Sequence, residues 1–353
     1  MSCLRVVSCG VGIWLVAGAA AIGGPDGQEL LYVGNNRGGT ISVIEVPAFK
    51  VVGEFDAVPD IARSQRAPGS YVDDLVAPSS GEVLYVSRGD ARDIAAFSTD
   101  RERLLWRLPT QGVADHFALS PDGKRLFVSV ENEGRALVID TAKREVVGQF
   151  ENGPGPHGMR LSPDGSRVYN GCITGNQLAV ADATTFQVLK RIQFDEGVRP
   201  FDITPDGRKM FLQLSKLHGF LELDLRSDRI TKTVHLPVPE GVSHQQVYPH
   251  TAHHGLALTP DGRHLCVGST VAGYMAILSV PELDLLATIP VGKEPSWVIP
   301  SLDGRYCYVS ARGENTVSVI SIDERKEVAR VRVGDYPQRM WTVRVPRRPP
   351  SSP

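Results

Sequence analysis

Short runs of alternating apolar and polar residues recur along nearly the whole chain, and turns rich in Gly, Asn and Asp separate them. One unit shows the order: the turn "SPDG" (120–123) precedes the runs "RLFVSV" (125–130), "ALVID" (136–140) and "VVGQF" (146–150). Another short run precedes the turn. Alternating runs between such turns predict β-strands, so each unit predicts four strands.

The units repeat at a fixed spacing. A Pro-Asp-Gly turn or a weaker copy of it recurs, and the residue eight positions before its glycine marks the start of a first strand. These strand starts are Asp73, Asp115, His157, Arg199, His254, Ser296 and Gln338, the last found by matching "VGDYPQRMW" to "VGKEPSWVI". Neighbouring starts are 42 residues apart, except that Arg199 and His254 are 55 apart because one unit carries 13 extra residues. Four strands in a repeat of about 40 residues predict a propeller blade.

The two ends of the chain supply complementary parts of one further blade. Residues 30–55 contain the second, third and fourth strands of a unit, whereas residues 339–345 contain only a first strand. Pairing them closes the ring and hides a sheet edge. The sequence therefore predicts an all-β fold, one seven-bladed β-propeller domain over 30–345 with four antiparallel strands per blade. The C-terminal strand pairs with the N-terminal blade.

The repeats resemble those of YVTN-type β-propellers. The segments 30–55 ("LLYVGNNRGGTISVIEVPAFKVVGEF") and 307–334 ("CYVSARGENTVSVISIDERKEVARVRVG") follow the pattern Tyr-Val-(Ser/Thr)-Asn and then Asn-Thr-(Val/Ile)-Ser-Val-Ile-Asp. The resemblance covers about residues 30–345. It implies a seven-bladed ring of the kind shared with the cytochrome d1 haem domain and the seven-bladed lactonases. Such a fold hosts many activities and does not fix one.

The strand starts are the first candidates for a functional site. First strands lie innermost in a propeller, so their starts are expected to circle the channel mouth on one face. All seven positions are polar, and the positions that follow them add Asp74, His116, Trp297 and Arg339. Solvation alone does not require two histidines, two aspartates and an arginine. We therefore predict ligand contacts from Asp73, Asp115, His116, His157, Arg199, His254 and Arg339.

Two long connections point to the same face. The stretch from the end of a fourth strand to the next start is 18 residues for Phe55 to Asp73 and for Leu236 to His254, against 5 for Phe194 to Arg199. We expect the loops 56–72 and 237–253 to cover the mouth, because functional residues concentrate on such loops. They add the candidates His250 and Tyr248, and then Arg63, Arg66, Tyr71, His244 and His253. Turns after second strands add Arg88, Glu131, Lys216, His218 and Arg312.

Three kinds of function fit these residues. The first is a binding module for a small ligand, a cofactor or a partner protein on the mouth face. The second is a metal- or haem-dependent oxidoreductase, with a metal on His157, His254 and Asp115. The d1 resemblance implies haem with His157, His254 or His116 as axial ligand, and no Cys-x-x-Cys-His motif for covalent haem is present. The third is a lactonase-like hydrolase using Asp73, Asp115, His157 and Arg199.

The N-terminus and the composition bear on location and partners. Residues 1–24 have the layout of a secretory signal peptide, with Arg5 before an apolar stretch and then small residues. We expect a periplasmic or secreted protein without a stable membrane span; a retained anchor is the alternative. The net charge of -2 argues against a nucleic-acid partner. A monomer is expected, and the Pro/Ser-rich tail 346–353 is expected to be disordered.

Three cysteines follow the predicted signal peptide: Cys172, Cys266 and Cys307. An odd number excludes a complete set of disulfides. Each cysteine lies in or beside an apolar strand-like run, so buried free thiols are expected, with one bridge as the alternative.

Overall fold

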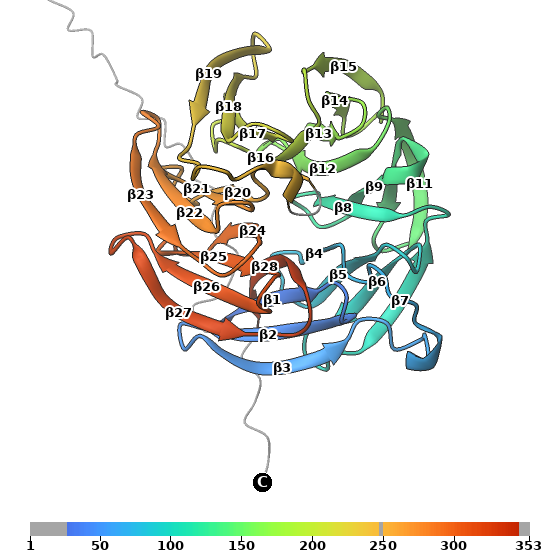
Figure 1. Cartoon of the computed structure of the whole chain (residues 1–353). Coiled ribbons are helices and arrows are strands. Elements are labelled where there is room, and N and C mark those ends of the chain that lie inside the picture. Colours follow the sequence, from blue (N-terminus) through green and yellow to red (C-terminus); the bar gives the residue numbers. More distant parts are fainter. Residues whose placement is uncertain (1–26, 247–249, 346–353) are drawn as a thin grey trace, which may run out of the picture.

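The computed structural model describes residues 27–246 and 250–345, and in them 28 strands form seven four-stranded antiparallel sheets around a central channel (Figure 1). The predicted seven-bladed propeller is thereby confirmed. The proposed signal peptide (1–24), the tail (346–353) and Tyr248 lie outside the described residues. Within the described part, no helix is long and apolar enough to cross a membrane.

Each blade begins with its innermost strand, and the other three follow outward. Blade 1 contains β28 (Pro337–Val345), β1 (Gln28–Asn35), β2 (Thr40–Val46) and β3 (Lys50–Asp56), and blade 2 contains β4 (Asp74–Val76), β5 (Val83–Arg88), β6 (Asp93–Ser98) and β7 (Leu104–Pro109). Blade 3 contains β8 (Ala114–Leu119), β9 (Arg125–Val130), β10 (Arg135–Asp140) and β11 (Glu145–Glu151), and blade 4 contains β12 (Pro156–Leu161), β13 (Arg167–Cys172), β14 (Gln177–Asp182) and β15 (Val188–Gln193). Blade 5 contains β16 (Val198–Ile203), β17 (Lys209–Leu214), β18 (Gly219–Asp224) and β19 (Arg229–His235), and blade 6 contains β20 (Leu256–Leu258), β21 (His264–Ser269), β22 (Tyr274–Ser279) and β23 (Leu285–Pro290). Blade 7 contains β24 (Pro295–Pro300), β25 (Tyr306–Ala311), β26 (Thr316–Ser321) and β27 (Lys326–Arg332), and three short 3-10 turns are η1 (Arg63–Gln65), η2 (Glu131–Glu133) and η3 (His244–Gln246).

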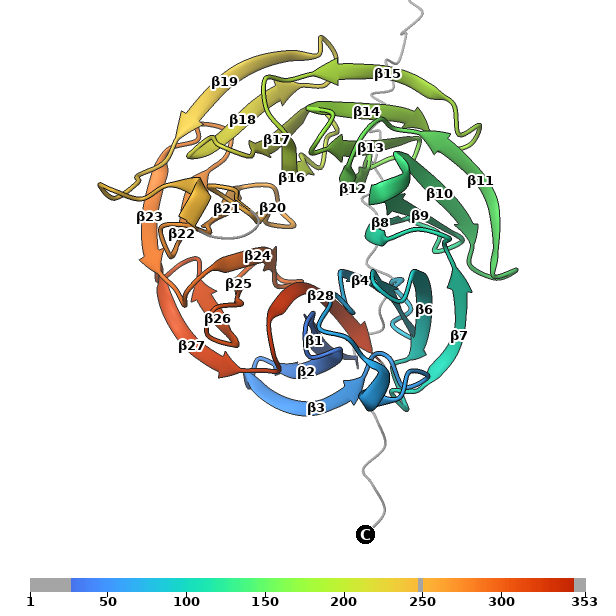
Figure 2. The ribbon, with the colours of Figure 1, turned by 45° about the vertical axis from the view of Figure 1, so that its right-hand side comes forward.

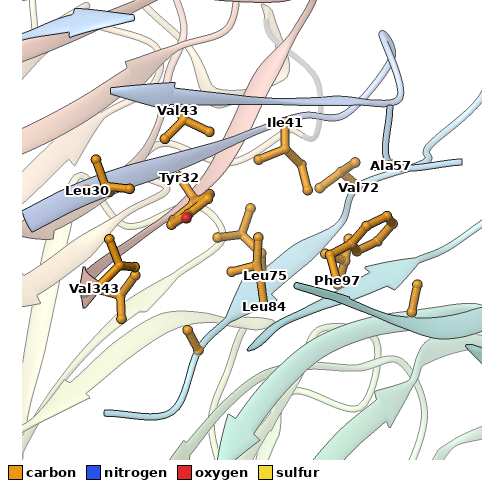
Figure 3. Packing of buried hydrophobic residues seen from close by; sticks show 14 residues of the cluster. Leu30, Tyr32, Ile41, Val43, Ala57, Val72, Leu75, Leu84, Phe97 and Val343 are labelled. Atoms are coloured by element: carbon orange, nitrogen blue, oxygen red, sulfur yellow. The ribbon is translucent and has the colours of Figure 1, made fainter. Parts of the chain in front are cut away.

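The apolar core lies between neighbouring blades. Figure 3 shows one such layer, in which Tyr32 and Val343 of blade 1 belong to the same buried cluster as Leu75 and Leu84 of blade 2. Successive side chains of a strand point to opposite faces, so each of the inner strands serves the layers on both of its sides. The outermost strands are largely exposed, as in β3 and β15. Each blade is therefore held by both of its neighbours.

The ring is closed by β28, which runs antiparallel beside β1 in both views (Figures 1 and 2). Leu30 pairs with Val343 and Tyr32 with Trp341. Without β28, the inner edge of β1 would be left unpaired.

A disulfide joins two neighbouring blades. Cys266 of β21 and Cys307 of β25 form it, with their Cα atoms 6.8 Å apart, and both residues are fully buried. Cys172 is a buried free thiol. The expectation of free thiols is therefore wrong for Cys266 and Cys307. These two cysteines occupy equivalent second-strand positions one repeat apart, and only the side-by-side packing of the blades brings them together.

Removal of this bridge is expected to lower the free energy of unfolding by about 4 kcal/mol, because a cross-link across 41 residues restricts the unfolded chain. The variant Cys266→Ala/Cys307→Ala and the wild type should be unfolded in urea with and without dithiothreitol. The reductant should destabilise the wild type and leave the double variant unchanged. Equal stability of the two oxidised proteins would contradict the expectation.

Candidate functional site

A cavity of about 840 Å³, here called the mouth chamber, opens at one end of the channel. The innermost strands surround it (Figure 2). Six of the seven predicted strand starts line it: Asp73, Asp115, His157, Arg199, His254 and Gln338. The seventh, Ser296, is fully buried. Residues 42 apart in the sequence thus meet in one chamber.

A β-bulge places several of these residues. The pairing register shifts between Ala114 and Phe117 in β8, and equivalent shifts occur in β12 and β16. A bulge redirects side chains that would otherwise alternate between the two faces of a strand. Consecutive residues therefore meet: Asp115 Oδ1 lies 3.7 Å from Nε2 of His116.

Buried polar side chains of the second strands stabilise the bulged backbone. Ser129 Oγ donates to the carbonyl of His157 at 2.7 Å, and Asn170 Nδ2 donates to that of Gly158 at 2.8 Å. Carbonyl groups that the sheet leaves unpaired thus find partners. The backbone that carries His157 is fixed from two blades.

Four residues at the chamber floor form what we call the histidine–aspartate cluster: Asp74, Asp115, His116 and His157. His116 Nδ1 lies 3.1 Å from Asp74 Oδ2, which also accepts from the backbone N–H of Phe117 at 3.1 Å. Nε2 of His116 lies 3.3 Å from Nε2 of His157. Asp115 Oδ2 lies 3.6 Å from the same nitrogen of His157.

Arg339 and Trp297 lie beneath this cluster. The guanidinium of Arg339 is 4.0 Å from the centre of the Trp297 ring and contacts Nε2 of His116. Trp297 and Asp74 also line a second cavity of about 510 Å³, whose other lining residues include Met159 and Trp341. The fully buried side chains of His116 and Arg339 line neither cavity. They form a floor between the two.

Burial dominates the electrostatics of the floor. It raises the pKa of Asp73 to about 6 and that of Asp115 well above its usual value, with Glu131 and Asp73 adding repulsion at Asp115. It also lowers the pKa of His116 and of His157 well below the usual value, and the neighbouring His116 adds to the effect at His157. The neutral imidazoles are consequently available as lone-pair donors at neutral pH.

The structure sorts the predicted site residues into three groups. Those lining the mouth chamber are Asp73, Asp115, His157, Arg199 and His254, whereas His116 and Arg339 lie below it. Around the predicted metal trio, it is His116 rather than His254 that places a ligand atom near those of Asp115 and His157. The His254 ring lies 5.8 Å from that of His157, and its Nδ1 donates to the carbonyl of Ser296 at 2.7 Å.

The two long loops differ in what they contribute. Loop 56–72 reaches the chamber with Gly69 and Ser70, whereas no described residue of loop 237–253 lines it. Arg66 pairs with Asp56 at 2.7 Å and so braces its own loop. His250 is exposed and its Nδ1 lies 3.2 Å from the carbonyl of Gln245. The expected two-sided cover is therefore seen only for the first loop.

His253 gives the second loop a pH-dependent anchor. Burial, with a further contribution from nearby His218, lowers the pKa of His253 to about 3. Because the folded state holds this ring neutral, its contribution to stability is lost as the pH falls below about 6.5, by about 1.4 kcal/mol per pH unit. Unfolding in urea between pH 7 and pH 4 should show that His253→Gln flattens this slope by one proton. An unchanged slope would contradict the assignment.

A haem group does not fit the mouth chamber. The faces of a tetrapyrrole need mainly apolar walls. The walls here carry the carboxylates of Asp73, Asp115 and Glu131 and the guanidinium groups of Arg199 and Arg312. The chemistry of the walls suits a small polar molecule instead.

Comparisons with known proteins agree on the fold. No known family and no curated protein matches the chain by sequence. Among solved structures it is similar to a chain of Kuenenia stuttgartiensis hydrazine synthase, with a TM-score of 0.51 and 20% sequence identity. The match covers 71% of this chain and 95% of the other. At this identity the similarity shows the β-propeller fold alone.

Proposed function

We propose that this protein is an exported YVTN-type propeller that binds a small polar molecule in the mouth chamber. The observation that supports the proposal is that strand starts from six blades converge on one cavity of about 840 Å³. They bring carboxylate, imidazole and guanidinium groups to the same wall. A few convergent polar groups in a concave site are typical of small-molecule binding.

The charges of the chamber indicate the chemical class of the ligand. Guanidinium groups of Arg37, Arg199 and Arg312 line it, and arginine pairs with carboxylates through two parallel hydrogen bonds. Asp73 and Asp115 face the same space and accept hydrogen bonds from hydroxyl or amino groups. A small carboxylate that also carries a hydroxyl or amino group would satisfy both sets.

The proposed export has support from the disulfide. Bridges such as Cys266–Cys307 persist in oxidising compartments and are rare in the cytosol. The signal-like segment 1–24 points the same way.

The test is a binding screen with defined probes: α-amino acids, 2-hydroxy acids and dicarboxylates, measured by thermal shift and then by calorimetry. We expect at least one class to bind, and Arg199→Gln to weaken its binding tenfold or more. Arg208→Gln, on an exposed turn, serves as the matched control and should bind like the wild type. Absence of binding from all three classes, or equal loss in both variants, would refute the proposal.

Lactone hydrolysis is the second candidate, favoured by the arrangement of Asp115 beside His157. A carboxyl whose pKa is raised by burial donates a proton at neutral pH, and a neutral imidazole accepts one. A panel of lactones should be incubated with the wild type and with Asp115→Asn. Hydrolysis at equal rates by both proteins, or by neither, would remove this candidate.

A further inference from the structure

We propose that Asp115, His116 and His157 bind a divalent transition-metal ion at the floor of the mouth chamber. This inference rests on the proposed ligand site and names a cofactor for it. Two imidazole nitrogens and one carboxylate are a donor set that Zn²⁺ and Fe²⁺ accept with positions left open for a ligand.

The distances suit a single ion. The three ligand atoms lie within 4.8 Å of one another. The separations are 3.3 Å between the two Nε2 atoms, 3.7 Å from Asp115 Oδ1 to His116 Nε2 and 3.6 Å from Asp115 Oδ2 to His157 Nε2. Tetrahedral ligands at zinc bond lengths stand about 3.4 Å apart. Little rearrangement of these side chains would be needed.

The surroundings of the cluster are those of a metal site. Asp74 Oδ2, 3.1 Å from Nδ1 of His116, fixes the tautomer whose Nε2 carries the lone pair. Within the described part of the chain, Asp115 Oδ2 is buried and makes no hydrogen bond, and neither does Nδ1 of His157. A buried carboxylate oxygen without a donor is costly, and a metal ion would satisfy it.

The charge balance also favours a cation. Asp73, Asp74 and Asp115 are buried around the floor, and Arg339 is the guanidinium among them. Arg160 lies near Asp202, at 3.8 Å, and Arg199 donates to Ser215 at 2.9 Å. A divalent ion would offset the excess of negative charge.

Arg339 acts as a competitor for this position. Its Nη2 contacts Nε2 of His116, the lone pair that the metal would take. We expect the guanidinium to turn toward Asp73 Oδ2, which has no hydrogen-bond partner among the described residues, when the ion binds. Removal of this like charge should strengthen metal binding.

The test uses the full chain stripped with EDTA and titrated with Zn²⁺ by calorimetry and with Co²⁺ by visible absorption. The wild type should bind one ion with a ligand-field spectrum typical of nitrogen and oxygen donors. His157→Ala and Asp115→Asn should each weaken binding at least 100-fold, and Arg339→Gln should tighten it about tenfold. The control His264→Ala, on β21 away from the chamber, should bind like the wild type.

The outcomes separate this inference from the proposed function. Circular dichroism and urea unfolding in EDTA verify that each variant folds. No binding by the wild type, equal binding by the ligand variants, or loss of binding in folded Arg339→Gln would overturn the metal site. Carboxylate binding to the EDTA-treated protein would then leave the proposed function intact. Metal binding without binding of any carboxylate probe would overturn the proposed function alone.

Discussion

A chain that ends at Tyr336, and therefore lacks β28, is expected not to fold at 37 °C. The deletion exposes the inner edge of β1 and removes Met340, Val343 and Val345 from buried layers. Each such side chain contributes about 1.5–3 kcal/mol, so the apolar loss alone approaches the 5–15 kcal/mol of a typical folded protein.

Circular dichroism and limited proteolysis of the truncated chain provide the measurement. A chain ending at Val345, which keeps the whole of β28, is the matched control and should unfold cooperatively. Cooperative unfolding of the shorter chain with unchanged stability would show that ring closure does not hold the propeller together.

Replacement of Arg88 by alanine is expected to cost about 3–5 kcal/mol of stability, because it leaves a buried carboxylate without its partner. The Arg88 side chain is fully buried and pairs with Asp93 at 2.6 Å and with Asp60 at 2.5 Å. These pairs also tie the start of loop 56–72 to blade 2.

Arg107 offers a matched comparison, since it lies 3.2 Å from Asp60 and 3.5 Å from Asp93 but is 55% exposed. Arg107→Ala should cost less than about 1 kcal/mol. Urea unfolding of both variants compares the same carboxylates with a buried and an exposed cation. Similar losses in the two variants would contradict the role assigned to burial of the Arg88 side chain.

Much of the fold could be predicted from the sequence because a propeller repeats its local pattern. The spacing of 42 residues and the complementary ends, 30–55 and 339–345, were enough to predict the seven blades and their closure. The bridge between Cys266 and Cys307 could not be predicted in this way. It depends on how neighbouring blades pack, and no local pattern records that packing.

The candidate site was only partly predictable, for a similar reason. The spacing placed Asp115 and His157 on one rim, but it placed His116 there as well. The bulge in β8 directs His116 below the rim, toward Asp74, and makes it a neighbour of His157. Arg88 likewise carried the same sequence signal as Arg312, yet it serves an internal ion pair, because Asp60 and Asp93 fold around it.

Crystallographic screening of small carboxylates against this protein would show directly where it binds ligands. We predict density in the mouth chamber, with a carboxylate at Arg199 and a hydroxyl or amino group toward Asp73 or Asp115. Ligands found only outside this chamber, or side chains of Asp115 and His157 turned into the packed interior, would contradict this assignment of the binding site.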